Sequence, residues 1–375
     1  MVSNFIFIFF ILTFVLNNEE TCNIESNEKI KFHNVKNFIN SKIYQNTVLI
    51  VEFEKYHLEC LPGLTKYFID LGYKVDIILN KKQSESMEKF RPIKDIRIFE
   101  LKRKEIKKKL KKFKKQIKNY KFILLETIQY KSIGFYKKIG IYNNPKTLFL
   151  IHHLDKLYSL GINQTISKNY VFSLADYGII PYVNPNYFGD FKLSHEKNKN
   201  SFFITATRNR HFKYFIEGVS YLKNKSIDFE INVVGIGGFN IQNVPKELRN
   251  YFHFYGQVKY QTMYNIVKNT DFIIINLYPN QKYDILFKTY RATGNIQLAY
   301  GFYKPVIIEE SFANIYKFTN ETAIIYNEYN ISSAMLKAAT MSKEEYQNMS
   351  IKVKYLQENI YNLSLNNLKK ILKKQ

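Results

Sequence analysis

The chain has 375 residues, of which 46% are apolar, and its formal net charge is +24. This length and composition suffice for two ordinary domains with sizeable cores, and the two cysteines, Cys22 and Cys60, exclude a disulfide framework or a cysteine-based metal cluster. The charge, carried mostly by lysine, favours anionic partners such as nucleic acid, acidic lipid headgroups or phosphorylated substrates, although a joint enrichment in Lys, Asn, Ile, Tyr and Phe explains it equally well.

An apolar run near the start of the chain, residues 5–16, is interrupted only by Thr13. The run is shorter than the ~20 residues that a membrane-spanning helix needs. It has no Lys or Arg before it and no clear small-residue cleavage site after it. We therefore expect residues 1–28 to form a hydrophobic leader or a weak membrane anchor, with a buried strand or helix as the alternative.

The first half of the chain alternates short apolar runs with helical patterns. Residues 47–53 form a continuous β-branched and apolar run, as expected of a strand that is covered on both faces. A helical pattern then ends at Gly72 and another strand follows, and the repetition of such units implies a parallel sheet. The predicted strands are residues 47–53, 74–79, 97–101, 122–125, 147–151 and 178–182.

Two consecutive histidines, His152 and His153, follow the predicted strand at residues 147–151. A parallel sheet presents its binding residues just past the carboxyl ends of its strands. These side chains are therefore candidates for chemistry, and a purely structural role is equally compatible with the sequence.

Residues 102–118 combine an apolar stripe with many lysines. The stripe has the spacing i, i+4, i+7 and i+11, which places it on one face of a predicted helix. Either this helix packs its stripe on the sheet and leaves its lysines in water, or its basic face lies on an anionic membrane, at ~1 kcal/mol per cationic residue. The stripe consists of Ile106, Leu110, Phe113 and Ile117.

Residues 184–200 are polar, include Pro185 and Gly189, and are predicted to link two domains. The second half then repeats the architecture of the first. We expect an N-terminal domain at residues 46–184, a C-terminal domain at residues 201–340, and a helical segment at residues 341–375 that packs across both domains or covers only the second. The predicted strands of the second half are residues 202–205, 229–235, 251–255, 271–277, 306–308 and 322–326.

Two segments of the second half have the features of an anion site. Thr293, Gly294 and Asn295 open a helical pattern, and a helix start offers unpaired N–H groups and the positive end of the helix dipole. Arg208 and Lys213 lie five residues apart in a loop between a strand and a helix. Arg offers phosphate oxygens a planar fork and Lys a mobile point charge. Together the two segments are predicted to hold a diphosphate.

This arrangement resembles the two-domain GT-B glycosyltransferases, particularly the large retaining family-4-like group. In that group a strand precedes a G-R-x-x-x-x-K-G motif whose Arg and Lys grip the diphosphate of the donor. Arg208 and Lys213 have the matching separation, and Thr207 and Tyr214 stand in place of the glycines. The resemblance implies an α/β protein with two Rossmann-like, doubly wound domains that face each other across a cleft.

Further segments carry the same resemblance, which covers roughly residues 47–326. The run YGQV is similar to the F-x-G-x-V segment of the family, which implies that Gly256 and Val258 lie near the nucleotide base. The run AYGFYKPV looks like the A-x-G-x-P-V-V helix exit of the family. His57 and Glu59, like His152, lie where loops of the first domain meet the acceptor in that family.

The chain departs from the family pattern at the glutamates that contact the donor. Gln297 and Leu298 stand where a glutamate is usual, and the earlier glutamate of the pair is also missing. This departure leaves the identity of the donor and the stereochemistry open. No Asp-x-Asp pair occurs in the sequence. We therefore expect cationic side chains and backbone dipoles, rather than a metal, to neutralise the leaving group.

The resemblance implies a hexosyltransferase-type enzyme that moves a sugar from a nucleotide-diphosphate donor to a saccharide or lipid-linked acceptor, with retention and without a metal or another cofactor. Arg208 and Lys213 would stabilise the charge of the leaving phosphate together with the helix start. His152 or His153 would position or deprotonate an acceptor hydroxyl. A sugar-nucleotide epimerase and a non-catalytic carbohydrate-binding protein of the same fold are the alternatives. A basic nucleic-acid-binding protein fits less well, because the usual recognition motifs are missing from the sequence.

The expected location follows from the N-terminal apolar run and from the lysines of residues 102–118. Both favour contact with an anionic membrane surface, and we expect the protein on its cytoplasmic face, with the lumen of the secretory pathway as the alternative. No specific nucleic-acid partner is expected.

Overall fold

The computed structural model describes residues 32–54, 57–80, 87, 95–156, 171–207 and 210–374. Two expectations, the hydrophobic leader at residues 1–28 and the diphosphate contact of Arg208, lie outside the described residues. Among the helices that are described, none is both long enough and apolar enough to cross a membrane.

In the described part of the chain, the first sheet has seven parallel strands in the order β1-β4-β3-β2-β5-β6-β7. Every residue of β2, β5 and β6 is buried, as expected of apolar runs covered on both faces. The strand order reverses between β2 and β5, and open α/β sheets bind ligands at such a reversal. The bounds are β1 (Phe32–His33), β2 (Thr47–Glu52), β3 (Lys74–Leu79), β4 (Ile96–Glu100), β5 (Phe122–Leu125), β6 (Thr147–Ile151) and β7 (Val171–Ser173).

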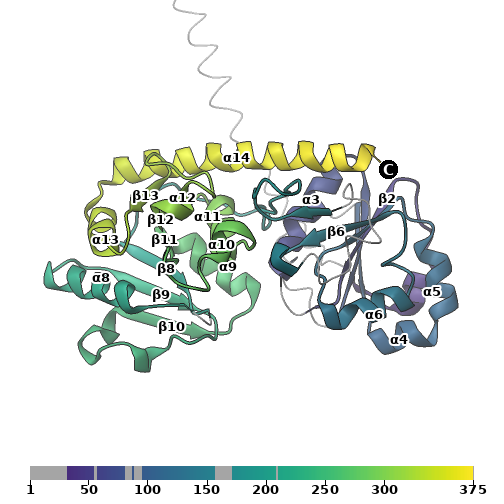
Figure 1. The fold of residues 1–375 in the computed structure, drawn as a ribbon, viewed down its shortest axis with the longest axis horizontal. Coiled ribbons are helices and arrows are strands. Elements are labelled where there is room, and N and C mark those ends of the chain that lie inside the picture. Colours follow the sequence, from purple (N-terminus) through teal and green to yellow (C-terminus); the bar gives the residue numbers. More distant parts are fainter. Residues whose placement is uncertain are drawn as a thin grey trace, which may run out of the picture. The chain divides into compact units, whose positions relative to one another are not determined.

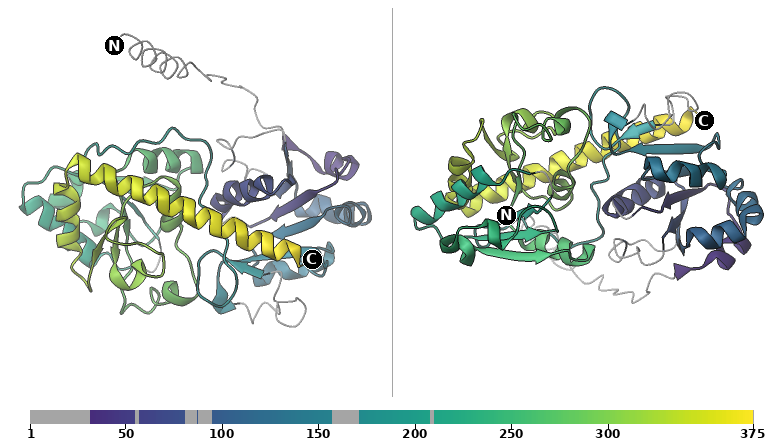
Figure 2. Two further views of the ribbon diagram at one scale, coloured as in Figure 1. Left: turned by 90° about the horizontal axis from the view of Figure 1, so that it is seen from above. Right: turned by 60° about the horizontal axis from the view of Figure 1, so that its bottom comes forward.

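Helices connect these strands and flank the sheet (Figure 2). Strand β1 and the helix after it precede residue 46, where the sequence places the start of this domain. Pro62 lies in the first turn of α3, where a missing N–H is tolerated, and the chain leaves this helix through Gly72 at a φ of 82°. The helical elements are α2 (Val35–Asn40), η1 (Leu58–Cys60), α3 (Leu61–Asp70), α4 (Arg103–Lys108), α5 (Leu110–Ile117), α6 (Tyr130–Lys138) and η4 (Leu154–Lys156).

The second sheet is also parallel, and its strand order is β10-β9-β8-β11-β12-β13. This order reverses between β8 and β11, so the loops that follow these two strands flank the second crevice. The strands are β8 (Ser201–Thr205), β9 (Glu230–Val234), β10 (Phe252–Gly256), β11 (Phe272–Ile275), β12 (Val306–Glu309) and β13 (Ala323–Tyr326). The helical elements are α8 (Lys213–Asn224), η6 (Ile241–Asn243), η7 (Lys246–Tyr251), α9 (Tyr260–Asn269), α10 (Leu286–Thr289), α11 (Gly294–Gly301), α12 (Glu310–Ala313), α13 (Ile331–Thr340) and α14 (Lys343–Lys373).

The second sheet buries both of its faces in separate apolar clusters. Ile274 and Ile307 belong to one cluster, whereas Ile273 and Ile308 belong to the other. This division follows from the alternation of side chains along a strand. It explains why β11 and most of β12 are continuous apolar runs in the sequence.

The long helix α14 packs on both domains, which decides between the two arrangements that the sequence left open (Figure 1). The hydroxyl of Tyr346 donates a hydrogen bond to the main-chain carbonyl of Asp271, at 2.8 Å, beside the second sheet. Towards the other end of the helix, the ring of Tyr361 stacks on that of Tyr67 in α3, with centroids 4.6 Å apart. The hydroxyl of Tyr361 also donates to the Asp70 carboxylate.

The last strand of the first sheet differs from the prediction. The sequence predicts a strand at residues 178–182, but the sheet ends with β7, and Tyr182 forms only an isolated bridge with Ser173. The N–H of Gly178 donates to the side chain of Asp176, and Gly178 has a φ of 69°. Such a turn interrupts an extended chain, and the apolar character of the segment alone did not reveal it.

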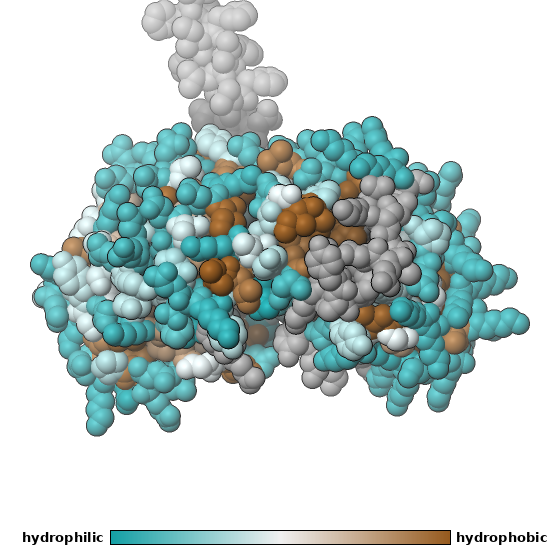
Figure 3. Space-filling view, in the orientation of Figure 1, coloured by the Kyte–Doolittle hydropathy of each residue, from teal (hydrophilic) through white to brown (hydrophobic). Residues whose placement is uncertain are grey.

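The lysine-rich segment folds as two helices instead of the single predicted one. Helices α4 and α5 are separated at Lys109, which has a φ of −117° and a ψ of 26°. The predicted stripe is kept, because Ile106, Phe113 and Ile117 are buried and Leu110 is half-buried. The surface over these helices is largely hydrophilic (Figure 3). We define the lysine face as the exposed residues Lys107, Lys108, Lys109, Lys111, Lys112, Lys114, Lys115 and Lys118.

Replacing either of two helical glycines of the first domain by alanine should change the free energy of unfolding, with opposite signs at the two positions. A Cβ added at Gly63 in α3 would lie 2.7 Å from the Cα of Pro185, whereas a Cβ added at Gly134 in α6 would meet no atom within 4 Å. We expect Gly63→Ala to lower the free energy of unfolding by about 1–3 kcal/mol through overpacking. Gly134→Ala should raise it by about 0.5–1 kcal/mol, because alanine favours a helix over glycine. Urea unfolding followed by circular dichroism measures both, and effects of the same sign would contradict the close packing of α3 on the linker.

Candidate functional site

The candidate site lies where the strand order of the first sheet reverses. Strands β2 and β5 are neighbours, with Val51 opposite Leu125, so the residues that follow them meet at one edge of the sheet. The chain continues from β2 towards His57 and Glu59, and from β5 towards Glu126. These loops therefore flank the crevice at which open α/β sheets usually bind ligands.

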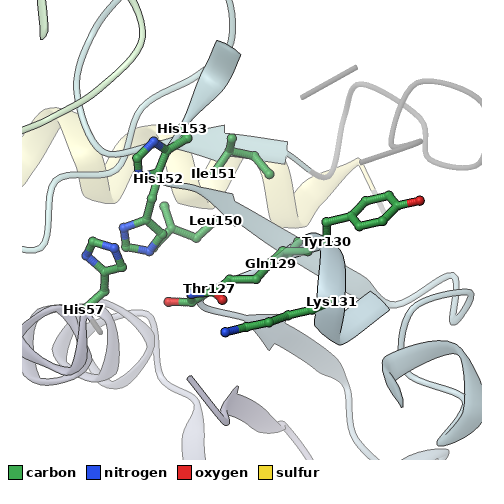
Figure 4. Close-up of a pocket in the computed structure, with 10 residues that line it drawn as sticks. His57, Thr127, Gln129, Tyr130, Lys131, Leu150, Ile151, His152 and His153 are labelled. Atoms are coloured by element: carbon green, nitrogen blue, oxygen red, sulfur yellow. The ribbon is translucent and has the colours of Figure 1, made fainter. Parts of the chain in front are cut away.

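A cavity of about 460 Å³ opens at this edge (Figure 4). In the view of Figure 4, the rings of His57 and His152 and the amino end of Lys131 lie towards one end of the cavity, whereas the Tyr130 ring points away from them. Tyr130 is 79% exposed. The cavity thus combines polar groups at one end with an exposed aromatic ring at its rim. It is lined by His57, Thr127, Ile128, Gln129, Tyr130, Lys131, Leu150, Ile151, His152 and His153.

The surroundings of His152 fix a single tautomer of its neutral ring. Its Nε2 lies 3.0 Å from the main-chain carbonyl oxygen of Glu126. Because a carbonyl oxygen can only accept, Nε2 carries the proton and Nδ1 keeps its lone pair. Within the described ranges, this Nδ1 is buried and has no hydrogen-bond partner. Burial lowers the pKa of His152 well below its usual value, and the neighbouring His57 and His153 lower it further, so the ring is neutral at neutral pH.

His57 approaches His152 from the loop after β2. The two rings are stacked, with centroids 3.9 Å apart. The backbone of His57 is left-handed, at a φ of 71°, which costs a residue other than glycine of order 1–3 kcal/mol. Its Nδ1 lies 3.6 Å from Oε1 of Glu59. The fold therefore brings together two predicted site elements, the acceptor loop and the histidine at the end of β6.

His153 lines the same cavity but also contacts the second domain. Its main chain forms an antiparallel bridge with Arg291, and the N–H of Leu154 donates to the carbonyl of Tyr290 at 3.0 Å. The guanidinium of Arg291 donates to the Asp155 carboxylate at 2.8 Å. Partial burial opposes ionisation of Asp155, but the Arg291 guanidinium outweighs it and lowers the pKa of this carboxyl. His153 thus lies at a junction of the two domains.

Glu59 connects the histidines of the cavity with the predicted diphosphate site of the second domain. Its Oε2 accepts a hydrogen bond from the hydroxyl of Tyr260, the first residue of α9, at 3.0 Å. A Cβ added at Gly294, which follows the N-cap Thr293 of α11, would lie 4.0 Å from Oε1 of Glu59. Burial opposes the charge, but the hydrogen bonds and the charge of His57 outweigh it and lower the pKa of Glu59. An anion of the chain itself therefore stands beside the predicted diphosphate site.

Two buried carboxyl groups lie at the same strand ends. Glu52 closes β2, Glu126 follows β5, and both are fully buried. In the described structure, neither oxygen of Glu126 has a hydrogen-bond partner, and Oε2 of Glu52 has none. Burial raises the pKa of both carboxyls well above the usual value, and Glu52 raises that of Glu126 further, which favours their neutral forms. No group of three or more His, Cys, Asp or Glu among the described residues is arranged to hold a metal ion.

The loop between β8 and α8 is described on both sides of Arg208. Lys213 begins α8 and is exposed. Arg210, in contrast, binds the buried carboxylate of Asp284 at 2.5 Å, and its guanidinium lies 4.2 Å from the centre of the Phe287 ring. The charge of Arg210 is therefore already paired within the second domain, whereas Lys213 presents its charge to solvent.

The two predicted anion segments lie at the carboxyl end of β11. The side chain of Asn276, just after β11, donates to the main-chain carbonyl of His211 in the first segment, at 3.0 Å. Asn295, in the second segment, donates to the carbonyl of Ile274 within β11, at 3.3 Å. Both segments thus meet at the reversal of the second sheet, and their roles in binding stay predictions.

The predicted base region lies at the same edge of the second sheet. Gly256 has a φ of 65°, and its carbonyl accepts from the N–H of Gly235 at 2.7 Å. Val258 packs against the core of this domain. A Cβ added at Gly237 would lie 1.9 Å from the carbonyl oxygen of Ala206, so the loops after β8 and β9 approach each other as closely as only glycine permits. The three loops after β8, β9 and β10 are therefore adjacent.

Sequence reasoning overlooked the loop after β5. Thr127 and Lys131 line the cavity, and the rule that identified His152 at the end of one strand applies equally to the residues after this one. The same rule applies to Glu126, the first residue after β5, but nothing in the sequence shows that it is buried with Glu52. In the sequence they are single acids after apolar runs, and only the pairing of β2 with β5 shows that they meet in a buried environment.

Comparisons with known proteins bear on the fold. No protein-family model matches the chain, and no curated protein is detectably similar to it in sequence. Its structure is similar to that of a glycosyltransferase from Rickettsia africae ESF-5, with a TM-score of 0.57 and 16% identity over 88% of this chain and 99% of that one. It is also similar to HepE from Anabaena in complex with UDP and glucose, with a TM-score of 0.52 and 11% identity over 87% of this chain and 98% of that one.

A third similar structure is an alpha-glucosyltransferase in complex with UDP and a 13-mer DNA, with a TM-score of 0.52 and 12% identity over 84% of this chain and 99% of that one. Similarity at such low identity establishes the fold alone. The chain has the GT-B fold, two Rossmann-like domains each built on a parallel sheet, and this prediction from the sequence is confirmed.

The buried carboxyl of Glu126 predicts a pH-dependent effect on stability. Because its pKa is raised in the folded protein, the folded state binds a proton that the unfolded chain releases above its ordinary pKa of 4.5. The stability from this carboxyl is therefore present at low pH and is lost as the pH rises above that value. We expect Glu126→Gln to gain stability over wild type as the pH rises above about 5, by up to about 1.4 kcal/mol per pH unit, until the folded protein also releases the proton.

Urea unfolding at several pH values measures this difference. Glu196→Gln, at an exposed position, is the control and should show no trend with pH. A difference between Glu126→Gln and wild type that stays constant with pH would contradict the burial of an ionisable group at this position.

Proposed function

We propose that the protein is a glycosyltransferase that moves a sugar from a nucleotide-diphosphate donor to an acceptor hydroxyl bound beside His152. The observation that carries this proposal concerns His152, a neutral histidine that lines the cavity of about 460 Å³ at the reversal of the first sheet: its buried Nδ1 has no partner among the residues that the structure describes. A cavity of this volume lies in the range of small-molecule sites. The GT-B fold supports the proposal, because the similar structures with this fold include glycosyltransferases.

The donor binds on the second domain in this proposal. Lys213, Arg208 and the N–H groups at the start of α11 stabilise the negative charge of the leaving diphosphate. Gly256 and Val258 lie beside the nucleotide base. The nucleotide sugar is the substrate, and the proposed reaction uses neither a metal nor another cofactor.

The reaction requires the acceptor oxygen to form a bond to the anomeric carbon while the bond from that carbon to the phosphate oxygen breaks. His152 accepts the hydrogen bond of the acceptor hydroxyl at Nδ1 and so orients the attacking oxygen. A ring whose pKa is strongly lowered is a poor final carrier of the proton. The hydroxyl proton therefore goes to the leaving phosphate, which is the course of a retaining reaction on one face of the sugar.

A sugar-nucleotide epimerase or a carbohydrate-binding protein without activity is the rival reading. Both alternatives are favoured by Gln297, a buried residue of α11. It stands where the GT-B family that this chain resembles usually has a glutamate that contacts the donor. Donor turnover that requires a saccharide acceptor distinguishes the transferase from both alternatives.

The variant His152→Phe tests the proposed site. Phenylalanine keeps an aromatic ring but has no nitrogen to accept the hydrogen bond of the acceptor hydroxyl, and we expect the turnover number to fall by about 10²-fold. The affinity for UDP should stay unchanged, because His152 belongs to the acceptor side. The measurement is UDP release from a panel of UDP-sugars with saccharide acceptors, with UDP affinity determined in parallel. Turnover close to that of wild type would rule out the assignment of His152.

The proposal includes binding to an anionic membrane, and the lysine face is the observation that supports this partner. The eight lysines of this face are exposed while the apolar stripe below them is buried in the first domain, so the charges point to solvent. An anionic membrane surface attracts such a cluster with ~1 kcal/mol per cationic residue. The protein then works at the cytoplasmic face of a membrane, where a lipid-linked saccharide is the acceptor.

Flotation with vesicles of phosphatidylcholine and phosphatidylserine tests this partner. We expect the triple variant Lys111→Gln, Lys112→Gln, Lys115→Gln to bind these vesicles about 100-fold more weakly than wild type, because three cationic contacts are lost. The matched control removes three exposed lysines at the end of α14 and should bind like wild type. It carries Lys369→Gln, Lys370→Gln and Lys373→Gln. Equal losses in both triple variants would show a general charge effect instead of a lipid-binding face.

A further inference from the structure

Glu59 has contacts on both sides of the candidate site. Its Oε1 lies 3.6 Å from Nδ1 of His57, whose ring stacks on that of His152 in the cavity. Its Oε2 accepts the hydrogen bond of Tyr260. A Cβ added at Gly294 would lie 4.0 Å from Oε1. One side chain therefore reaches the histidines of the acceptor side and the helix start of the donor side.

The carboxylate of Glu59 carries its charge at this position. The side chain is 19% exposed, and burial alone would favour the neutral acid. The hydrogen bond and charge of His57 and the hydroxyl of Tyr260 outweigh burial, and the pKa of Glu59 lies below its ordinary value. Helix starts stabilise anions through their unpaired N–H groups and the helix dipole. The start of α11 thus has the chemistry of an anion site, and an anion of the chain already stands beside it.

We infer that Glu59 occupies, in the protein without nucleotide, the place at the start of α11 that the donor diphosphate takes, and that its displacement couples donor binding to His57. This inference rests on the proposed function, because it requires a nucleotide-diphosphate ligand. Two anions at such short range repel each other, and a helix start has few N–H groups to share between them. The donor therefore has to displace Glu59, which acts as a positioning residue.

The displacement reaches the acceptor side through His57. A carboxylate that leaves Tyr260 and Gly294 retains His57 as its nearby partner, at 3.6 Å in the present arrangement. It then turns towards that ring and changes the stacking of His57 on His152. Donor binding thereby prepares the acceptor cavity, which predicts an ordered reaction in which the donor binds first.

The affinity for UDP tests the competition. Isothermal titration of the full chain compares wild type with Glu59→Gln, which keeps the shape of the side chain and removes its charge. We expect Glu59→Gln to bind UDP about threefold to thirtyfold more tightly. Tyr260→Phe removes one hydrogen bond that holds Glu59 in place, and should bind UDP about twofold to fivefold more tightly. Glu196→Gln removes the same charge from an exposed position and should bind UDP like wild type.

A gain of affinity is informative because structural damage does not produce it. Tighter binding of UDP by Glu59→Gln or by Tyr260→Phe supports the inference. Equal or weaker binding by both variants overturns it and leaves the proposed function intact, provided that wild type binds UDP. If none of the four proteins binds UDP or ADP, the proposed function fails and the inference fails with it.

The coupling to the acceptor side is tested separately by the magnetic resonance signals of the histidine rings. The resonance of the His57 ring is assigned by its loss in His57→Gln. We expect UDP to shift this resonance in wild type and to leave it in place in Glu59→Gln. Shifts of equal size in both proteins would show that the nucleotide acts on His57 without Glu59, and would overturn the coupling.

Discussion

The parallel hydrogen bonding of β2 with β5 is the interaction on which the candidate site depends. It sets Val51 opposite Leu125 and so brings the next residues, Glu52 and Glu126, to one edge of the sheet. The loops that follow are adjacent at their origins and diverge from there, because the strand order reverses between these two strands. The cavity fills the space between them, and His152 enters it from the neighbouring strand β6. The same elements in another strand order would separate these groups.

Burial at this edge lowers the pKa of a base and raises the pKa of an acid. It favours the neutral ring of His152 and the neutral forms of Glu52 and Glu126. Glu59 keeps its charge nearby, because His57 and a tyrosine hydroxyl compensate for the loss of water. The result is a charged Glu59 close to three side chains that burial keeps neutral. In such a poorly solvated setting the interactions of a charge are stronger than at the surface, so this anion responds to a second one.

The contacts between the domains differ in kind from one side to the other. Near the candidate site they are single polar contacts, such as the one from Tyr260 to Glu59 and the one from Arg291 to Asp155. Helix α14, in contrast, runs along both domains (Figure 2), and aromatic side chains of this helix pack on each of them. Polar contacts can be exchanged for contacts with a charged ligand at little net cost, whereas buried apolar contacts cannot. This difference suits the proposed function, in which a diphosphate enters the site while the domains stay connected.

The sequence by itself determined the order and the type of most elements, because buried strands are continuous apolar runs: residues 74–79, 122–125 and 147–151 coincide with β3, β5 and β6. It also determined that His152 stands at a strand end. Tertiary structure alone decided that Arg210 forms an ion pair with a buried carboxylate, and that Glu59 lies beside the start of α11. The reason is physical: periodicity reports what a segment buries, whereas the partners of a side chain depend on which strand ends become neighbours, and that is set by contacts between residues far apart in the chain.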